Sequence, residues 1–402
     1  MTTSSPHAHL WNLDESMLYL NHGSFGAATV ATRERKQAIQ DQIESQPGRF
    51  FLRELFGLMV EAREAIGSLV GAAAKDIALM PNATAAVNTV LRSLTFEPGD
   101  EIIVTSHGYN ACNNAAYFVA ERWGATVVNV DIPFPIEGPH VVTERVLAAV
   151  SPKTRLALID HITSPTALIY PVGTLVQELE AKDIPVLIDG AHAPGMLSLN
   201  LERLGASYYT GNCHKWLCTP KGSAFLHVRE DRQPPIRPLS ISHGANDPTE
   251  KQSMFRNEFD WLGTHDPSAV LSVPVGIKTL ASCFDNGIDG VMAHNHTLVM
   301  EMREKFCQAL EIEPPCPRSM IGSIASLPIN LDALSSPEGT DPIQNLLFEK
   351  YNIEAYIAAP PRNPTRALRL SAQLYNHPSQ FETFLEALLE IQRDHDMTLR
   401  RA

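Results

Sequence analysis

Two segments of the chain carry the side chains with the clearest chemical potential. The apolar run PVLIDGAHAPG (185–195) ends its strand-like part at Asp189, and YYTGNCHKWLCTPKG (208–222) holds Lys215 between His214 and Trp216, just after the next predicted strand. Parallel sheets bind ligands at the carboxyl ends of their strands. We therefore expect a carboxylate and a lysine amine to face the same crevice.

This pair suits one kind of cofactor chemistry. A lysine amine can form an imine with an aldehyde, and a carboxylate can hold a protonated pyridine nitrogen so that the ring withdraws electrons from an amino acid's Cα. Pyridoxal phosphate requires both. Taken alone, Asp189 would more often cap a turn and Lys215 would more often be a surface lysine, but the two in this strand context favour a cofactor site.

A phosphate group also needs a binding turn. The segment Pro81-Asn82-Ala83-Thr84-Ala85 stands directly before a predicted helix. Free backbone amides and the Thr84 hydroxyl at such a helix start can bind an anion. An ordinary N-cap at Asn82 or Thr84 explains the same residues, and the two interpretations are compatible.

The elements around these segments predict an α/β fold. Apolar strand-length runs alternate with helical patterns between residues 77 and 228, which indicates a mainly parallel sheet covered by helices. From about residue 266 the pattern becomes that of a smaller α+β unit, beginning with helices over 268–284 and 288–311. We expect an N-terminal arm (1–26), a large cofactor-binding domain (27–265) and a small C-terminal domain (266–402).

Composition excludes several other classes of protein. The formal net charge is −13, which argues against nucleic acid or an anionic membrane surface as the main partner. The six cysteines are scattered and predict reduced thiols in the cytoplasm rather than a disulfide framework. No signal peptide, transmembrane run, Walker A loop or G-x-G-x-x-G is found in the sequence. A zinc site built from Cys213, Cys218, His192 and His214 is conceivable, but a cofactor lysine explains that segment better, so we expect no metal.

The motifs resemble a known family. LIDGAHAPG, GNCHKWLCTPKG, LNHGSFG (20–26) and LRLSAQLYN (368–376) are similar to the class-V aminotransferase group of fold-type I pyridoxal-phosphate enzymes. The most similar branch contains isopenicillin N epimerase-like proteins, related to C–S lyases and cysteine desulfurases. The resemblance covers nearly the whole chain and implies a fold-type I PLP-dependent transferase-like architecture.

The resemblance implies cofactor roles for particular residues. Lys215 corresponds to the Schiff-base lysine and Cα proton shuttle, Asp189 to the partner of the pyridine nitrogen, and His192 to a residue near the ring hydroxyl. Tyr109 corresponds to the aromatic residue that stacks on the ring. Ser164 stands where relatives often have an asparagine. The residues that correspond to phosphate ligands are Ala83, Thr84, Asn212, His214 and Thr264.

The remaining implied roles concern substrate and assembly. Arg369 resembles the arginine that grips the substrate carboxylate through two parallel hydrogen bonds, and Asn21 and His22 resemble residues of the substrate pocket. Thr264 resembles a threonine that reaches the phosphate of a neighbouring subunit, which implies a homodimer with shared sites. Cysteine desulfurases carry a nucleophilic cysteine where this chain has YIAAPPRNP (356–364), so persulfide chemistry by that route is not expected. Cys316 is the loop cysteine that could substitute, and we interpret it as structural.

Several reactions share these residues. Deprotonation at Cα can lead to epimerisation, which is the branch resemblance, to C–S β-elimination on a cysteine conjugate such as hercynylcysteine sulfoxide, or to transamination. A non-catalytic regulator that binds the cofactor is a further alternative, disfavoured by the complete set of Lys215, Asp189 and Arg369. The sequence does not choose between the reactions or identify the substrate, beyond an amino acid.

Overall fold

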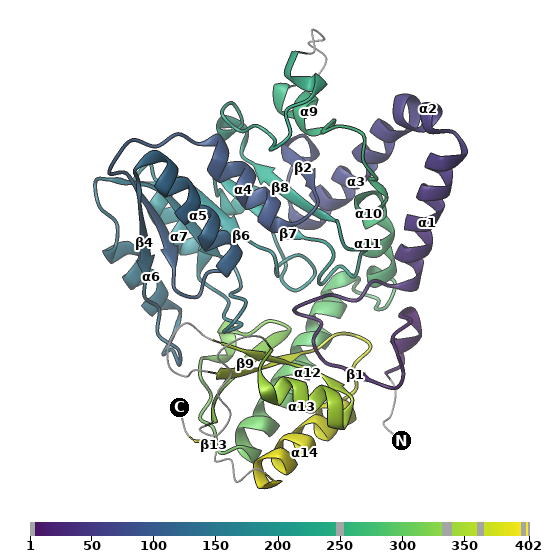
Figure 1. Ribbon diagram of the computed structural model, residues 1–402, viewed down its shortest axis with the longest axis vertical. Coiled ribbons are helices and arrows are strands. Elements are labelled where there is room, and N and C mark those ends of the chain that lie inside the picture. The colour runs from purple at the N-terminus through teal and green to yellow at the C-terminus, as the bar shows by residue number, and fades with distance from the viewer. Residues whose placement is uncertain (1–4, 247–252, 332–339, 360–365, 395–398, 401–402) are drawn as a thin grey trace.

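The computed structural model describes residues 5–246, 253–331, 340–359, 366–394 and 399–400. Its largest element is a seven-stranded sheet with the order β2-β8-β7-β6-β5-β3-β4 (Figure 1). The central run from β7 to β4 is parallel, whereas β8 is antiparallel to both β7 and β2. The expected mainly parallel α/β sheet is confirmed. Its strands are β2 (Ile77–Met80), β3 (Glu101–Thr105), β4 (Thr126–Val130), β5 (Thr154–Asp160), β6 (Val186–Asp189), β7 (Tyr208–Asn212) and β8 (Ala224–Val228).

Helices cover both faces of this sheet. Alternate residues of one strand belong to two separate apolar cores: Leu156 and Leu158 of β5 lie in the core that contains residues of α4 and α5, whereas Ile159 lies in the core that contains residues of α1, α3, α6 and α7. This two-faced burial is why the strands read as nearly continuous apolar runs. The helices are α1 (Val30–Ser45), α2 (Pro47–Arg49), α3 (Leu55–Val70), α4 (Ala83–Ser93), α5 (Asn110–Trp123), α6 (Pro139–Ala148), α7 (Val172–Glu180), α8 (Leu201–Leu204) and α9 (Met254–Phe259).

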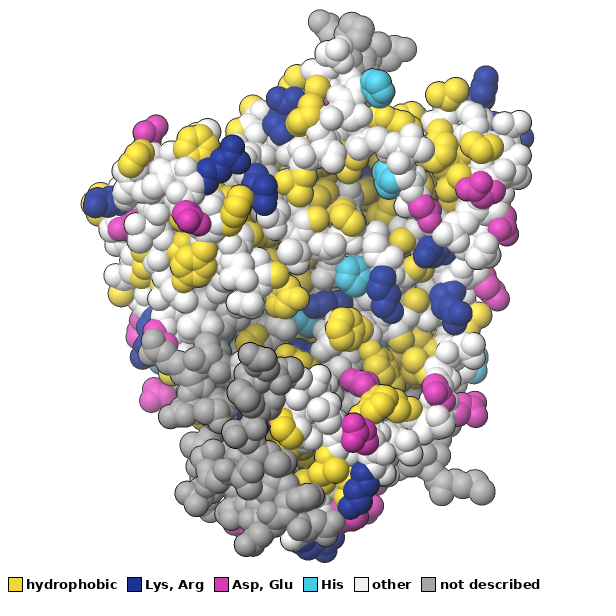
Figure 2. All heavy atoms as spheres, viewed as in Figure 1, with side chains coloured by type: hydrophobic (Ala, Val, Ile, Leu, Met, Phe, Trp, Pro, Cys, Tyr) yellow, Lys and Arg dark blue, Asp and Glu magenta, His cyan; other side chains and the backbone are white. Residues whose placement is uncertain are grey.

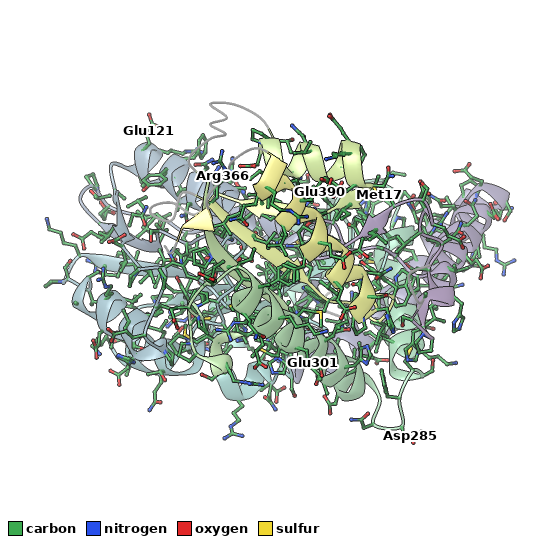
Figure 3. The ribbon with its side chains drawn as sticks, turned by 90° about the horizontal axis from the view of Figure 1, so that it is seen from below. Met17, Glu121, Asp285, Glu301, Arg366 and Glu390 are labelled. Carbon is green, nitrogen blue, oxygen red and sulfur yellow. The ribbon has the colours of Figure 1, made fainter. Side chains whose placement is uncertain are left out.

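The C-terminal part builds a second, smaller sheet. Its antiparallel order is β11-β12-β9-β13, and the helices α12 and α14 lie beside it, with Glu301 on α12 and Glu390 on α14 marked in the view from below (Figure 3). A separate two-stranded pairing joins β1 to β10, so the N-terminal segment lies against this smaller part. The elements are β1 (Leu18–Tyr19), β9 (Ile324–Leu331), β10 (Ile353–Glu354), β11 (Tyr356–Ala358), β12 (Arg366–Ser371), β13 (Leu399–Arg400), α10 (Ser268–Leu271), α11 (Val273–Ala281), α12 (Ile288–Ala309), α13 (Pro342–Tyr351) and α14 (Pro378–Asp394).

One predicted element differs in detail. The single helix expected over 268–284 is two helices, α10 and α11, with a break at Ser272. Pro274 stands in the first turn of α11, and proline cannot donate the amide hydrogen bond that a continuous helix needs there. Short one-turn segments complete the backbone: η1 (Ala8–Leu10), η3 (Ala74–Asp76), η4 (Glu230–Arg232), η5 (His243–Asn246), η6 (Arg318–Met320) and a π-helical turn, η2 (Phe50–Glu54).

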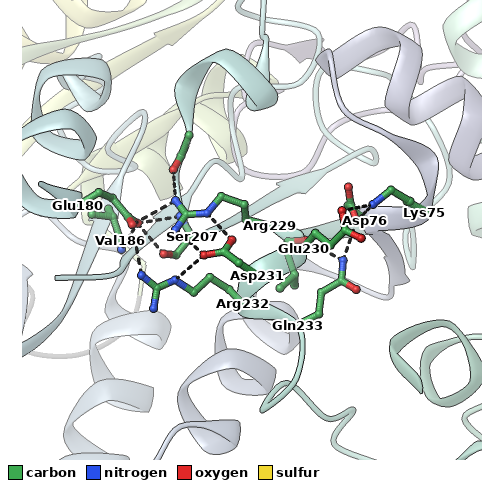
Figure 4. Close-up of polar contacts among 12 residues, drawn as sticks. Lys75, Asp76, Glu180, Val186, Ser207, Arg229, Glu230, Asp231, Arg232 and Gln233 are labelled. Carbon is green, nitrogen blue, oxygen red and sulfur yellow. Dashed lines mark hydrogen bonds and ion pairs between the residues drawn. The ribbon is translucent and has the colours of Figure 1, made fainter. Parts of the chain in front are cut away.

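The two ends of the large sheet differ in chemistry. At the amino ends of β6 and β7, Glu180 accepts hydrogen bonds from the backbone amides of Val186 and Ser207 (3.0 and 2.9 Å), and Arg229 contacts the same carboxylate at 3.1 Å (Figure 4). This network ties α7 to the strands that it covers. The opposite, carboxyl ends of the strands are left to form a cavity. Among the described residues, no helix is both long and apolar enough to cross a membrane.

Candidate active site

A cavity of about 210 Å³ lies at the carboxyl ends of the parallel strands. Lys, Arg and His side chains gather near the middle of the face shown in Figure 2, where the large and small parts of the molecule meet. Nine of the residues singled out from the sequence line the cavity: Ala83, Thr84, Tyr109, Ser164, Asp189, His192, Asn212, His214 and Lys215. Segments separated by more than a hundred residues in sequence therefore converge on one site.

Lys215 is held by a neutral histidine. Its Nζ lies 2.9 Å from Nε2 of His192, and the Trp216 indole donates to Nδ1 of the same ring at 3.4 Å. Burial, followed by the charge of Lys215, holds the pKa of His192 well below its ordinary value. A neutral imidazole cannot accept at both nitrogens. With Nδ1 accepting from Trp216, Nε2 carries the proton and can donate to Lys215 when the lysine amine is neutral.

The environment of Lys215 favours that neutral form. Burial, together with the charge of Arg369, lowers the pKa of Lys215 to about 8, although Asp189 acts in the opposite direction. A lysine with such a pKa has a much larger fraction of free amine near neutral pH than an exposed one. This is the property required of a nucleophilic amine or a general base.

Asp189 is fixed at the end of β6 by two donors. Its Oδ1 accepts from the Ala191 amide at 3.0 Å, and its Oδ2 accepts from the Cys112 thiol at 3.1 Å. Burial and the nearby Asp189 charge raise the pKa of Cys112 well above its ordinary value, so the thiol stays protonated and donates. Asp189 is also buried, which leaves its charge to be matched by a group in the cavity.

A second carboxylate stands beside Asp189. Asp160 ends β5 in register with Asp189, lines the cavity, and accepts the Tyr109 amide at 3.2 Å. Burial and the Asp189 charge raise the pKa of Asp160 well above its ordinary value, which favours the protonated form of Asp160. Through this bond Asp160 places the backbone of Tyr109, whose side chain is half-exposed at the cavity.

The start of α4 provides an anion-binding turn. Asn82 is its N-cap and accepts from the Ala85 amide at 2.8 Å, as the simpler sequence interpretation expects. Asn212 accepts from the Ala83 amide at 2.8 Å and so anchors the turn to β7. Across the residues that the structure describes, the Thr84 amide has no acceptor, which leaves one donor and the helix dipole directed at the cavity.

Two further side chains, His214 and Lys221, line the same cavity. Burial lowers the pKa of His214 to about 4, so its ring is neutral, and Nδ1 donates to the Ser223 carbonyl at 2.9 Å. Lys221 also lines the cavity, with its Nζ 2.6 Å from the Gly26 carbonyl. The region that would hold a phosphate thus contains an ammonium group as well as one free helix-terminal amide.

Arg369 contacts two residues that line the cavity, Ser164 and Ser24. Its Nη1 donates to the Ser164 carbonyl at 3.0 Å, and its Nη2 contacts the hydroxyl of Ser24 and, at 3.4 Å, Oδ1 of Asn21. The side chain is 1% exposed, and burial lowers its pKa to about 10. Its Nε is buried without a partner among the described residues. A guanidinium held in this way retains a donor for a carboxylate.

Four predicted residues are not among those that line the cavity: Arg369, Asn21, His22 and Thr264. The His22 ring is buried between the Tyr375 hydroxyl (2.9 Å) and the Lys215 carbonyl (3.0 Å), so it holds the backbone of the lysine loop. The same arm passes so close to that loop that a Cβ at Gly26 would lie 2.5 Å from the His214 carbonyl oxygen. Thr264 is exposed in the connection between α9 and α10.

Sequence reasoning missed several residues of the site. Asp160 carried a usable signal, because TRLALID ends in an acid as VLID does at the neighbouring strand. Cys112, Ser24 and Tyr356 carried none, since a thiol, a hydroxyl and a phenol have many surface roles and only their contacts with Asp189 and Arg369 make them informative. Within the described residues no group of three or more potential metal ligands is found.

Comparison with known proteins identifies the family. The model of the aminotransferase class-V family matches residues 13–326. The chain belongs to the class-V aminotransferase family. This membership confirms the fold-type I architecture and makes the protein a pyridoxal-phosphate enzyme. The cavity fits that cofactor, because it offers a buried carboxylate for a pyridine nitrogen, a lysine amine for the aldehyde and a free helix-terminal amide for the phosphate.

Individual class-V relatives span almost the whole chain. Isopenicillin N epimerase from Streptomyces clavuligerus is 31% identical over 94% of this chain and 95% of its own length. A probable chloroplastic L-cysteine desulfhydrase from Arabidopsis thaliana is 29% identical over 95% of this chain and 84% of its own length. Among solved structures, the apo cysteine desulfurase of Thermococcus onnurineus has a TM-score of 0.78 at 16% identity, covering 98% of this chain and 99% of its own.

Proposed function

We propose that the enzyme removes the Cα proton of an amino acid with Lys215 and that a proton is added to the opposite face of Cα, as in an epimerase. The observation that carries the proposal is the placement of Lys215, Asp189 and Ser164 around one cavity, with Ser164 bonded to Arg369. An amine base, a ring-nitrogen partner and a carboxylate clamp are the groups that Cα chemistry requires. The similarity to an isopenicillin N epimerase over nearly the whole chain supports the same reaction.

Each side chain has a distinct task in this proposal. Pyridoxal phosphate, when bound, supplies an electron-withdrawing ring that acidifies Cα. Asp189 holds the charge on the ring nitrogen, and the Thr84 amide and Lys221 hold the phosphate. Arg369 orients the substrate through its α-carboxylate, and Lys215 Nζ receives the Cα proton. His192, donating from Nε2, keeps that nitrogen in place. Inversion also requires a proton donor on the other face, either a second side chain or water.

A C–S β-lyase is the second candidate. It needs the same Cα deprotonation and differs in expelling sulfur from Cβ. The similarity to a probable cysteine desulfhydrase favours it. A persulfide on a cysteine of this chain is not required: no cysteine among the described residues lines the cavity, and residues 360–364 of the stretch where desulfurases carry theirs lie outside the described residues and contain no cysteine. An aminotransferase would also use Lys215, Asp189 and Arg369.

One experiment separates these reactions. The purified holoenzyme is incubated in D2O with a panel of L-amino acids and cysteine S-conjugates, and deuterium at Cα is followed by NMR alongside release of pyruvate and other keto acids. Exchange with inversion and no keto product is the expected result. Pyruvate and ammonia from the S-conjugates would replace the epimerase with a β-lyase. Absence of Cα exchange with every compound would overturn both proposals.

We also propose a homodimer with shared sites. Thr264 is exposed and lies away from the cavity of its own chain, as suits a residue that completes a partner's phosphate site. The division into an arm (1–26), a large domain (27–265) and a small domain (266–402) remains our proposal for the organisation of each subunit. The six cysteines, all of which are free, suit a reducing compartment such as the cytoplasm.

A further inference from the structure

Tyr356 is stacked on the guanidinium of Arg369. The two residues face each other across β11 and β12 as register partners, and the Arg369 guanidinium carbon lies 4.2 Å from the centre of the Tyr356 ring. Side chains of directly opposed residues in an antiparallel pair lie on the same face of the sheet. This places an aromatic face over one side of the guanidinium plane.

The edges of the same guanidinium are held by other segments. Ser164 accepts from Nη1, and Ser24 and Asn21 accept from Nη2, whereas Nε has no partner among the described residues. These edge contacts fix where the group sits, but a planar group bonded at one end can still tilt about that end. A ring stacked on the face restrains this tilt and so fixes the direction of the free N–H.

The strength of such a contact depends on its surroundings. Cation–π attraction is larger when the cation is removed from water, and Arg369 is 1% exposed. Arginine also stacks on aromatic rings more effectively than lysine does, because its guanidinium is planar. The orientation of the guanidinium plane is important for binding, because a carboxylate is bound best by parallel N–H donors that lie in its own plane.

We propose that Tyr356 is a positioning residue for the substrate α-carboxylate, acting by holding the plane of Arg369. The proposal deepens the proposed function and rests on it for the identity of the substrate as an amino acid. The ring of Tyr356, rather than its hydroxyl, holds the plane of the Arg369 guanidinium. The residue is half-buried and has no direct contact with the Lys215 amine among the hydrogen bonds of the described residues.

The test compares glycine with methylamine. Both have an amine that can react with the bound cofactor, but only glycine has the carboxylate that Arg369 would grip. Absorbance titration of the holoenzyme gives a dissociation constant for each, and their ratio isolates the contribution of the carboxylate from general changes at the site. Tyr356→Leu removes the π face, Tyr356→Phe keeps it without the hydroxyl, and Tyr356→Met fills the space with a flexible apolar chain.

Tyr356→Leu and Tyr356→Met are expected to lower the preference for glycine over methylamine by roughly tenfold, and Tyr356→Phe by about twofold at most. A wild-type ratio in both Leu and Met variants would overturn the proposal. Equal losses in Phe and Leu would also overturn it, since the hydroxyl would then carry the effect. If Tyr356→Leu and Tyr356→Met lost the cofactor while Tyr356→Phe retained it, the ring would have a role in folding, and the positioning role would be overturned. If no amino acid exchanges its Cα proton yet the ratio still depends on Tyr356, the proposed function fails and the positioning role stands.

Discussion

The two sides of the cavity are built in different ways. The centre of the cofactor side comes from one short stretch of the chain, in which the strands β6 and β7 end at Asp189 and Asn212 and a tight loop follows with Lys215; the start of α4 and Cys112 join it from farther away. The carboxylate side is assembled around Arg369 from the N-terminal arm, the loop after β5 and two strands of the small sheet. The placement of Asp189 and Lys215 on the cofactor side depends mainly on strand ends that the local sequence specifies. The carboxylate side depends on contacts between segments that are far apart in the chain.

This difference predicts how each side responds to change. On the cofactor side Lys215 and Asp189 each carry a task that no neighbour can take over, so substitutions of these two residues should be severe. On the carboxylate side several contacts share the placement of one guanidinium, so substitutions around Arg369 should have graded effects.

The largest effect is expected at Lys215. Lys215→Ala removes both the covalent attachment and the base, so the visible absorbance band of the lysine-bound cofactor should vanish and turnover should fall by roughly 10³-fold or more, given the usual contribution of a positioned base. Absorbance and Cα exchange measure the two losses. Lys182→Ala, which changes an exposed lysine on the surface, is the matched control. Retained absorbance and exchange in the Lys215 variant would remove the assignment.

Asp189 should follow. Asp189→Ala leaves a cofactor ring charge unpaired in a buried site, at a cost of about 2–5 kcal/mol, or roughly 30-fold to several thousand-fold in the rate of Cα exchange. The rate is measured at saturating cofactor so that weakened binding does not mask it. Asp160→Asn keeps the bond from the Tyr109 amide and should be much milder, because the raised pKa of Asp160 favours an uncharged form that asparagine resembles. Equal losses in the two variants would contradict the separate roles.

On the carboxylate side the loss should be graded. Arg369→Ala is expected to weaken glycine binding by roughly 30-fold or more, and Arg369→Lys by an intermediate amount, since lysine keeps the charge but not the planar fork. Methylamine binding should change little in either variant. A uniform loss for both ligands would mean that Arg369 supports the site as a whole and does not grip the carboxylate.

The two sides also interact electrostatically. Only neutral Lys215 can attack the cofactor aldehyde, so the rate of cofactor capture by the apoenzyme should rise about tenfold per pH unit below the lysine pKa. The midpoint should lie near 8, rather than at the ordinary value of 10.5. Arg369→Ala should move it upward, because the Arg369 charge lowers the pKa of Lys215. Stopped-flow absorbance measures the rate of cofactor capture as a function of pH. If the midpoint were the same in Arg369→Ala, the charge of Arg369 would not contribute to the lowered pKa of Lys215.

The smallest effect is expected at Cys112. Cys112→Ala removes one of the two donors to Asp189 and should reduce kcat/KM by about 2- to 10-fold, the range of a single hydrogen bond. Cys112→Ser restores a donor of similar size and should recover most of the loss. A Ser variant as poor as the Ala variant would indicate that Cys112 contributes packing instead of a hydrogen bond.

Much of the architecture could be predicted from sequence periodicity. Apolar strand-length runs ending in Asp189 and Asp160 specify strands of a parallel sheet. The helix over 268–284 was the exception, because the effect of Pro274 on amide bonding outweighed the apolar spacing. The residues on strand ends were therefore predictable as a set, even without knowing their distances.

The sequence by itself determined the residue types and the strand ends that bring Lys215 and Asp189 to one crevice, because local periodicity and side-chain chemistry are properties of neighbouring residues. Only the tertiary structure decided which residues support them. It placed His22 behind the lysine loop, turned Cys112 toward Asp189 and laid Tyr356 across Arg369. Such contacts join segments far apart in the chain, and no local pattern specifies which of many possible partners a side chain will meet.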